Sequence, residues 1–317
     1  MKTAIIYGPR DLRVEEVDRP DIGADDVLVR VRASGICGSD VHRYLGTDYG
    51  RTCSPYPMNS GHEYCGEVVE VGSQVQTFGE GDRVTLGVAW ASGDLGAFSD
   101  YLHVRDADRR LHKLPGEMDF IDGALIETFI VALKSYRRPS PTPDDSILIL
   151  GAGPIGLAVL LYCRAMGLGD ITMSEPSVVR RDLAARIGAV TVNPAVEDLA
   201  EVVASSGKEV DVVFECAGQE ETLKQAMRLT RPEGRISLIG HYSKTPHFNI
   251  EDLVMKGLNV FAPIGGNPFF DEAVELVAEK KVDLAQLVSH QYPIEKAQEA
   301  FDMASDVDRS VKVIFSD

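Results

Sequence analysis

The sequence predicts an α/β protein in which a β-rich half is followed by a doubly wound parallel sheet. Two observations predict this fold class. Short alternating or apolar runs dominate the chain before Ser146, and after it strand-like apolar runs alternate with amphipathic segments of helix length. The 317 residues are enough for about two domains, and 44% hydrophobic with 26% charged residues is typical of a globular protein.

The first half contains short runs that are bounded by glycine or acidic turns, at Val27–Val31, Gly66–Val71 and Asp82–Leu86. These runs predict an antiparallel sheet or barrel. The segment Arg137–Asp145 contains three prolines and cannot continue a helix. We therefore expect the joint between the two halves there.

The second half contains six expected strands with helices between them, which matches a doubly wound sheet of about six strands. The strands are expected at Ile147–Leu150, Ile171–Ser174, Ala189–Val192, Val210–Glu215, Arg235–Ile239 and Leu258–Phe261. The helices are expected at Pro154–Met166, Val178–Ile187, Glu220–Leu229 and, after the last strand, Phe270–Glu279.

Charge and targeting signals argue against several kinds of partner. The net charge of -17 would repel a phosphate backbone, so we expect no nucleic acid partner, and a solvated acidic surface is the simpler interpretation. The first apolar run is far shorter than a signal-peptide core, and glycines interrupt the charge-free stretch Ser146–Cys163, so no export signal or membrane span is expected. An odd number of scattered cysteines favours a reducing cytoplasm. They are Cys37, Cys53, Cys65, Cys163 and Cys216.

A glycine turn directly after the first strand of the second half predicts a dinucleotide site. The turn contains Gly151, Gly153, Pro154, Ile155 and Gly156 and leads into a helix. Glycines there allow a tight turn and a close approach to a pyrophosphate, and the helix N-terminus attracts an anion. A strand-to-helix turn without a ligand is the alternative.

An acidic residue follows this turn at the expected distance of about twenty positions. Glu175 ends the next strand and is placed to hydrogen-bond the adenosine ribose hydroxyls, which favours NAD over NADP. Arg180 and Arg181 leave this preference open, because either side chain could turn toward a 2′-phosphate or lie on a surface helix face.

Metal-ligand candidates lie in the β-rich half. Cys37 and His62 each occupy a turn with glycine neighbours, and zinc favours sulfur and nitrogen ligands. Glu127 is a carboxylate within a mostly apolar segment, where a charge is costly unless it is paired or bound to metal. A catalytic zinc uses three protein ligands, so Glu127 is the candidate for the third. Cys65 enters a strand, and we expect it in the core.

Five segments together resemble the zinc-containing medium-chain dehydrogenase/reductase family, which includes alcohol dehydrogenases. They are Gly35–His42, Gly61–Glu63, Gly81–Val84, Gly151–Gly156 and Asp211–Gly218. The likeness runs nearly end to end and is greatest to the sorbitol, polyol and threonine dehydrogenase branch. It implies a GroES-like catalytic domain at residues 1–128 and 261–317, and a Rossmann dinucleotide-binding domain at residues 129–260.

The resemblance also implies roles for single residues. Cys37, His62 and Glu127 would bind a catalytic zinc, which would act as a Lewis acid on the substrate oxygen. Glu63 would be an occasional ligand, or would act on the metal through another ligand.

Further roles implied by the resemblance concern the proton and the cofactor. Ser39 and His42 would relay the proton released from the alcohol, and Asp40 would orient His62. Lys312 would approach the cofactor pyrophosphate.

One departure from the family is visible in the sequence. The family usually carries a lobe with four closely spaced cysteines that bind a structural zinc, but Leu86–Ala97 contains no cysteine. We therefore expect one catalytic zinc and no structural zinc. Trp90, in the segment that replaces the lobe, could line the cleft or pack internally. A homodimer or homotetramer is expected, with subunit contacts built in another way.

The expected function is hydride transfer between NAD and a secondary alcohol or polyol, which gives the ketone. The polar segment Arg43–Tyr49 favours a sugar alcohol, cyclitol or amino alcohol, whereas Trp90 and Phe98 would suit a simpler secondary alcohol. Two alternatives stay open: a zinc-free quinone or enoyl reductase on the same fold, and a non-catalytic nucleotide-binding protein.

Overall fold

The computed structural model describes residues 1–48, 50, 55–86, 96–263, 265 and 267–316. Two compact units divide the chain. The first comprises Met1–Glu127, Phe270–Asp306 and Lys312–Asp317, and the second comprises Thr128–Phe269 and Val307–Val311.

The chain passes from the first unit to the second inside helix α4 (Phe120–Arg137). The proline-rich segment at 137–145, where the sequence suggests a joint, lies within the second unit instead. The units divide inside α4 because this helix is apolar on several faces. Its first part is buried in the first unit and its second part in the second unit. Its buried side chains include Leu125, Ile126, Phe129 and Leu133.

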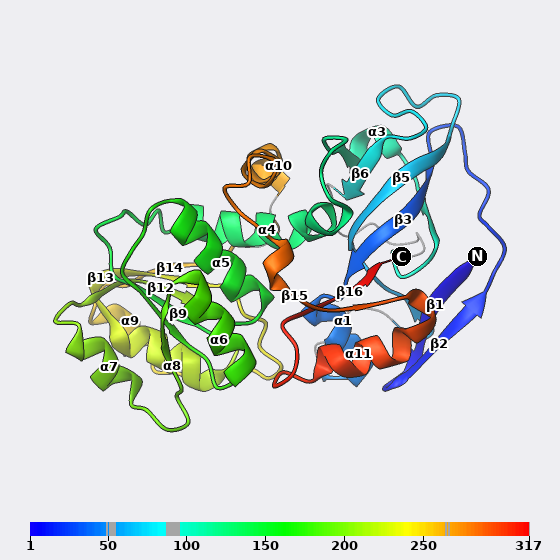
Figure 1. Ribbon diagram of the computed structural model, residues 1–317. Helices are drawn as coiled ribbons and strands as arrows, with labels where there is room; N and C mark the ends of the chain where they lie inside the picture. Colours follow the sequence, from blue (N-terminus) through cyan, green and yellow to red (C-terminus); the bar gives the residue numbers. More distant parts are fainter. Residues whose placement is uncertain (49, 51–54, 87–95, 264, 266, 317) are drawn as a thin grey trace. The chain divides into compact units, whose positions relative to one another are not determined.

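The larger sheet of the first unit has the strand order β15-β16-β3-β5-β6-β8, and β7 pairs with β3 (Figure 1). The antiparallel pairing of β3, β5 and β6 confirms the expected antiparallel sheet. Because β16 pairs with β3, the last segment of the chain lies beside one of the first. The strands are β3 (Val27–Gly35), β5 (Glu63–Val71), β6 (Arg83–Leu86), β7 (Tyr101–Val104), β8 (Leu111–Lys113), β15 (Val288–Tyr292) and β16 (Lys312–Ser316).

A smaller sheet with the order β2-β1-β4 and several helices complete the first unit. An aromatic core of Tyr44, Phe98, Phe301 and Phe315 packs α1 and α11 against β16. This packing fixes α1, whose N-terminus carries metal-ligand candidates. The elements are β1 (Lys2–Gly8), β2 (Asp11–Glu16), β4 (Met58–Asn59), α1 (Gly38–Leu45), α3 (Ala107–Arg110), α10 (Phe270–Ala278) and α11 (Ala297–Ser305).

The sheet of the second unit is parallel and has the order β11-β10-β9-β12-β13-β14 (Figure 1). All six expected strands are confirmed, although β13 begins earlier than expected and β11 and β14 begin one residue later. The order reverses between β9 and β12, which is the place where doubly wound folds bind nucleotides. The strands are β9 (Ile147–Leu150), β10 (Ile171–Ser174), β11 (Val190–Val192), β12 (Val210–Glu215), β13 (Thr230–Leu238) and β14 (Asn259–Phe261).

Helices connect these strands. The sequence predicts α5 (Pro154–Ala165), α6 (Val178–Ile187) and α8 (Glu220–Leu229), and the structure confirms them. It adds two short helices, α7 (Leu199–Ser205) and α9 (Glu251–Val254), which have too few turns for a periodic pattern. No helix among the described residues is long and apolar enough to cross a membrane.

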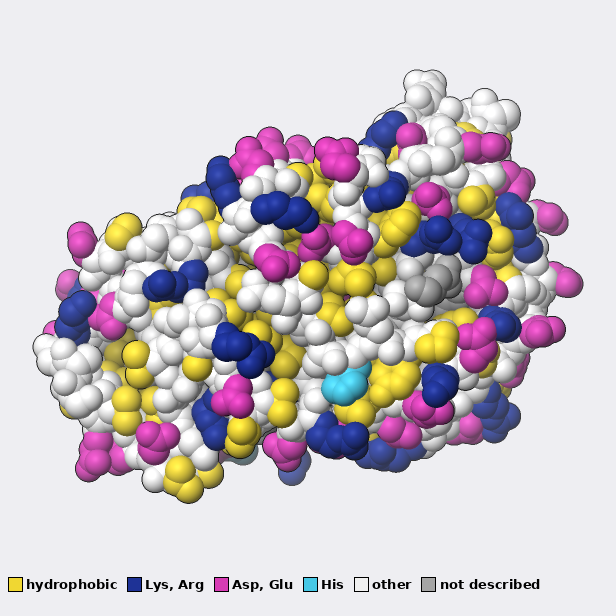
Figure 2. All heavy atoms as spheres, in the orientation of Figure 1, with side chains coloured by type: hydrophobic (Ala, Val, Ile, Leu, Met, Phe, Trp, Pro, Cys, Tyr) yellow, Lys and Arg dark blue, Asp and Glu magenta, His cyan; other side chains and the backbone are white. Residues whose placement is uncertain are grey.

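The surface carries both signs of charge. Figure 2 shows acidic and basic side chains interspersed on the visible face, with scattered apolar side chains between them. Neither sign of charge forms a large single patch on that face.

Candidate metal centre and dinucleotide turn

The structure brings three metal-ligating side chains together in the first unit. One ligand atom from each of Cys37, His62 and Glu63 lies within 4.8 Å of the others. Cys37 is the N-cap of α1, His62 directly precedes β5, and Glu63 is the first residue of that strand. A helix start and a strand start therefore supply the cluster.

Glycines make room for this arrangement. Gly61 has φ +106, and a Cβ there would lie 3.0 Å from Phe98, so glycine is required immediately before His62. Gly35 pairs with Glu63 across the sheet. A Cβ on Gly35 would lie 2.2 Å from Glu63 Oε2 and 3.0 Å from Lys312 Cε, so its hydrogen leaves space for these two side chains.

Asp40 links the two ligand turns. Its side chain is fully buried, its Oδ2 accepts the backbone N–H of Cys37 at 3.1 Å, and the same oxygen lies 3.9 Å from Nδ1 of His62. Its Oδ1 accepts hydrogen bonds from Arg43 at 3.0 Å and from Ser60. The distance to His62 is too long for a hydrogen bond, so Asp40 acts on that ring through its charge, and Arg43 is the cation paired with Asp40.

The electrostatics of the cluster favour bound positive charge. Burial tends to lower the pKa of His62, but the negative groups of Cys37, Asp40 and Glu127 raise it well above its ordinary value. Lys312 is buried as well, and although burial opposes it, the neighbouring Glu63 and Cys37 raise the pKa of its ammonium group. Both groups therefore hold a proton because anionic partners surround them.

The donor set fits a divalent metal ion. Cys37 as a thiolate and the carboxylates of Asp40, Glu63 and Glu127 are four anionic groups, whereas the permanent cations facing them are Lys312 and Arg43. A metal ion of charge +2 would make this set neutral, with the imidazole of His62 as a neutral ligand. Sulfur, nitrogen and oxygen donors together are typical of a catalytic zinc site.

Glu127 is not part of the three-residue group, although it is close enough to interact with His62, Glu63 and Lys312. Burial raises the pKa of its carboxyl group to about 7, with a further contribution from Glu63, while His62 lowers it. The geometry of the described residues therefore favours Glu63 as the third donor, and Glu127 as an anionic neighbour. Sequence reasoning ranked these two carboxylates in the opposite order.

The remaining residues expected at this site have partners of their own. Ser39 is buried and accepts a hydrogen bond from Arg43 at 3.3 Å, and Nδ1 of His42 lies 3.0 Å from Oγ1 of Thr47. Lys312 forms a buried ion pair with Glu63 and also donates to the carbonyl of Ile36. Its ammonium group is therefore engaged within the first unit.

The glycine turn of the second unit has the geometry that a dinucleotide site needs. Gly151 has φ +97, and a Cβ on Gly156 would lie 2.0 Å from the carbonyl oxygen of Gly151. Gly153 is the N-cap of α5, and Pro154 and Ile155 form its first turn. The start of α5 is the place where a helix N-terminus would meet a pyrophosphate.

Glu175 is buried beside this turn. Its carboxylate accepts the backbone N–H of Ala152 at 2.7 Å and that of Ser177 at 2.9 Å, so it links the glycine turn to the start of α6. Nε of Arg180 donates to the carbonyl of Ser310, and its guanidinium lies about 4.0 Å from the Cβ position of Gly153. Burial lowers the pKa of Arg180.

Other candidates fall outside the site. Cys65 is fully buried, as expected of a core residue, and burial raises its pKa to about 12. Trp90 and Cys53 lie outside the described residues.

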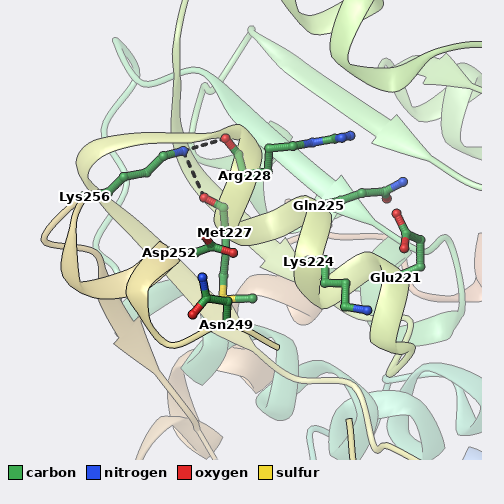
Figure 3. A pocket seen from close by; sticks show the side chains of 8 residues that line it. All are labelled: Glu221, Lys224, Gln225, Met227, Arg228, Asn249, Asp252 and Lys256. Carbon is green, nitrogen blue, oxygen red and sulfur yellow. Dashed lines mark hydrogen bonds between the residues drawn. The ribbon is translucent and has the colours of Figure 1, made fainter. Parts of the chain in front are cut away.

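A hollow of about 420 Å³ lies in the second unit between α8 and the segment around α9 (Figure 3). Glu221, Lys224 and Asp252 are among its lining residues. Lys256 donates to the carbonyls of Met227 and Arg228, so its charge caps the end of α8. This contact explains the lysine without a ligand.

Comparison with known proteins agrees with the fold. Residues 23–116 match the family described as alcohol dehydrogenase GroES-like domain, and residues 154–279 match the zinc-binding dehydrogenase family. (R,R)-Butanediol dehydrogenase of Bacillus subtilis (strain 168) is 32% identical over 318 residues, 91% of either protein. Sorbitol dehydrogenase of Homo sapiens is 32% identical over 329 residues, 94% of this chain and 91% of that protein.

A solved structure extends the agreement to three dimensions. That of 2R,3R-butanediol dehydrogenase from Bacillus subtilis has a TM-score of 0.89 and 31% identity, and the match covers 100% of this chain and 99% of that chain. Fold and site together define a metal-dependent oxidoreductase that uses a nicotinamide cofactor. The chain belongs to the zinc-dependent medium-chain alcohol and polyol dehydrogenases. Nothing in the comparisons supports the zinc-free or non-catalytic alternatives.

Proposed function

We propose that this dehydrogenase oxidises a secondary alcohol within a polyol, sugar alcohol, cyclitol or amino alcohol, with NAD as the hydride acceptor and a single catalytic zinc. The observation that carries the proposal is the grouping of Cys37, His62 and Glu63 within 4.8 Å, with the buried Asp40 behind it. The names of the butanediol and sorbitol dehydrogenases support the substrate class.

Different residues of the chain would bind the metal and orient its ligands. When bound to Cys37, His62 and a glutamate, zinc supplies Lewis acidity toward the substrate oxygen. We propose that the charge of Asp40 orients His62 and that Glu63 or Glu127 supplies the oxygen donor.

The proton of the alcohol must leave the site for hydride transfer to proceed. We propose that the hydroxyl of Ser39 accepts the substrate proton and that His42 passes it toward solvent. Both residues lie in α1, immediately after the ligand Cys37. Lys312 forms a buried ion pair with Glu63, and we propose that this pair holds the Glu63 carboxylate toward the metal.

NAD is preferred over NADP in this proposal because Glu175 occupies the end of β10. Its carboxylate already accepts two backbone N–H groups, so it is fixed in place and would repel a 2′-phosphate. We propose that Arg180, held by the carbonyl of Ser310, lines the cofactor side of the turn.

The sequence supports a catalytic zinc alone, because Leu86–Ala97 contains no cysteine. We further propose that the first unit is the catalytic domain and the second the dinucleotide-binding domain, which extends to Phe269 and not only to residue 260. A cytoplasmic location is consistent with Cys37, Cys65, Cys163 and Cys216, which are unpaired thiols.

We propose a homodimer or homotetramer. β14 is at the edge of its sheet, and exposed apolar side chains lie on and near this strand. They include Val260 (40% exposed), Phe248 (43%), Val254 (65%) and Met255 (79%). Sedimentation equilibrium of the wild-type protein would test this, and a monomer at micromolar concentration would contradict it.

The function is tested by NAD reduction across sugar alcohols, cyclitols, amino alcohols and simple secondary alcohols, before and after chelation. We expect turnover on at least one polyol, loss of turnover with the chelator, and recovery with zinc. Turnover that persists in the fully metal-free protein would overturn the proposal.

Variants separate the ligands. Cys37→Ser is expected to lose zinc while it still folds and binds NADH. Glu63→Gln and Glu127→Gln form a matched pair, and the larger loss of zinc affinity, about 10- to 100-fold, is expected for Glu63→Gln. The reverse order would show that Glu127 is the third ligand.

A further inference from the structure

A buried carboxylate in the second unit has no part in the function described above. Glu215 is the last residue of β12, and its side chain is fully buried. Its Oε1 accepts the backbone N–H groups of Ala217 at 3.0 Å and Gly218 at 2.9 Å, and the hydroxyl of Thr222 at 2.8 Å. Its Oε2 accepts the hydroxyl of Tyr242 at 2.7 Å. A buried charge with four donors is stable, and it orders the segments that supply them.

Three of the four donors come from two different loops, and the fourth, Thr222, lies in α8. Ala217 and Gly218 follow β12, whereas Tyr242 follows β13. The two loops are in close contact, because a Cβ on Gly240 would lie 2.2 Å from the backbone nitrogen of Gly218. Glu215 thus joins two loops at the carboxyl edge of the parallel sheet.

The position of Glu215 in the sheet connects these loops to the cofactor. Glu215 pairs with Leu150, the residue directly before the glycine turn, and a Cβ on Gly151 would lie 3.1 Å from Ala217. The order of strands reverses between β9 and β12, where a dinucleotide lies across the sheet edge. In the proposed function, on which this inference rests, Glu175 after β10 lies beside the adenosine half, so the loops after β12 and β13 would flank the other half.

We propose that Glu215 is a positioning residue, which through Tyr242 and the amides of residues 217 and 218 holds the loops after β12 and β13 in the conformation that receives the nicotinamide half of the cofactor. If Glu215 only stabilised the fold of the second unit, its loss would weaken the binding of all ligands of this unit to the same degree. If Glu215 positions the loops, its loss weakens the binding of ligands that contain the nicotinamide ring. The binding of ligands that lack this ring, such as ADP-ribose, is unchanged.

The test compares NADH with ADP-ribose, which lacks the nicotinamide. Tyr242→Phe removes one hydroxyl and is expected to raise the Kd for NADH about fivefold to tenfold, because a hydrogen bond to a charged group is lost. The Kd for ADP-ribose should stay within about twofold. NADH binding is followed by fluorescence, and ADP-ribose by competition. Glu215→Gln should change the ratio in the same direction.

Thr222→Val is the matched control. It also removes one hydrogen bond to Glu215, but that donor belongs to α8 and not to the loop after β13. Both dissociation constants are expected to stay within about twofold of wild type. If Glu215→Gln fails to fold, the Kd values of Tyr242→Phe for NADH and ADP-ribose are sufficient to test the proposal.

Equal weakening of NADH and ADP-ribose in Tyr242→Phe, or no weakening of either, would overturn the proposal and leave the cofactor assignment intact. A wild-type protein that binds neither NADH nor NADPH would overturn both.

Discussion

Replacing Gly35 by alanine tests whether the buried pair of Glu63 and Lys312 depends on the absence of a side chain at that position. The new Cβ would lie 2.2 Å from Glu63 Oε2, whereas contacts of 3.4 Å or more are ordinary. The carboxylate would have to move by more than an ångström in a part of the sheet where Gly35, Glu63 and Lys312 are all buried. No flexible, exposed group is available to give way.

The expected cost follows from two effects. Overpacking of a closely packed interior costs about 1–3 kcal/mol. If the displaced carboxylate also loses Lys312, the broken buried ion pair adds to this, since removing one partner of such a pair costs about 3–5 kcal/mol. We expect a loss of about 2–5 kcal/mol in the free energy of unfolding, together with weaker zinc binding because Glu63 is displaced.

The assay is urea unfolding of metal-free Gly35→Ala and wild-type proteins, followed by circular dichroism, with zinc affinity measured by competition with a chelator. Gly38→Ala is the matched control, because a Cβ there meets nothing within 4 Å and Gly38 is the exposed first residue of α1. Its effect should be neutral, or stabilising by up to about 1 kcal/mol. A Gly35→Ala protein within about 0.5 kcal/mol of wild type, with unchanged zinc affinity, would refute the reasoning.

Three other predictions concern charges held by specific partners. Arg43→Met removes the cation beside Asp40 and should weaken zinc binding about tenfold and change the visible spectrum of the cobalt-substituted protein, whereas Arg43→Lys should restore part of both. Glu175→Ala removes the acceptor of the Ala152 amide and should reduce the NADH-to-NADPH affinity ratio about tenfold, measured by fluorescence titration; an unchanged ratio would show that Glu175 does not select the cofactor. Although burial opposes it, the Ser146 amide and Arg231 lower the pKa of Asp211, so its stabilising effect is complete above the ordinary carboxyl pKa of about 3.9 and is lost as the pH falls through the lower folded value. The stability difference between wild type and Asp211→Asn should therefore shrink on acidification below about pH 4, and a constant difference would contradict the sign.

The doubly wound sheet could be predicted from the sequence because its signals are local. Each strand is an apolar run whose ends are marked by glycine or charge, and the glycine turn after β9 has a fixed spacing. The first residues of strands are harder to predict from the sequence. β13 begins at Thr230, ahead of the expected Arg235, because its first residues pair with β12 through an irregular register. Hydrophobic periodicity does not report such irregularities.

The metal centre could be predicted only in part. Cys37 and His62 lie in glycine turns that are visible in the sequence, but the choice between Glu63 and Glu127 depends on which carboxylate the fold brings within reach. An apolar setting identified Glu127 as a constrained carboxylate without telling how far it lies from the other ligands. Strand alternation does not single out Glu63, because the first four residues of β5 are all buried.

Lys312 shows why the remaining part of the site required the structure. By sequence it is one lysine in an apolar strand near the end of the chain, and the resemblance assigned it to the cofactor. Since β16 pairs with β3 at Gly35, the chain's last strand places this lysine against Glu63, a residue that lies far from it in sequence. The ion pair places a cation beside the Glu63 carboxylate within the buried cluster, where a carboxylate without a partner would be costly to bury. The C-terminal strand therefore completes the metal centre: it supplies the cation that lets four anionic groups face one divalent ion.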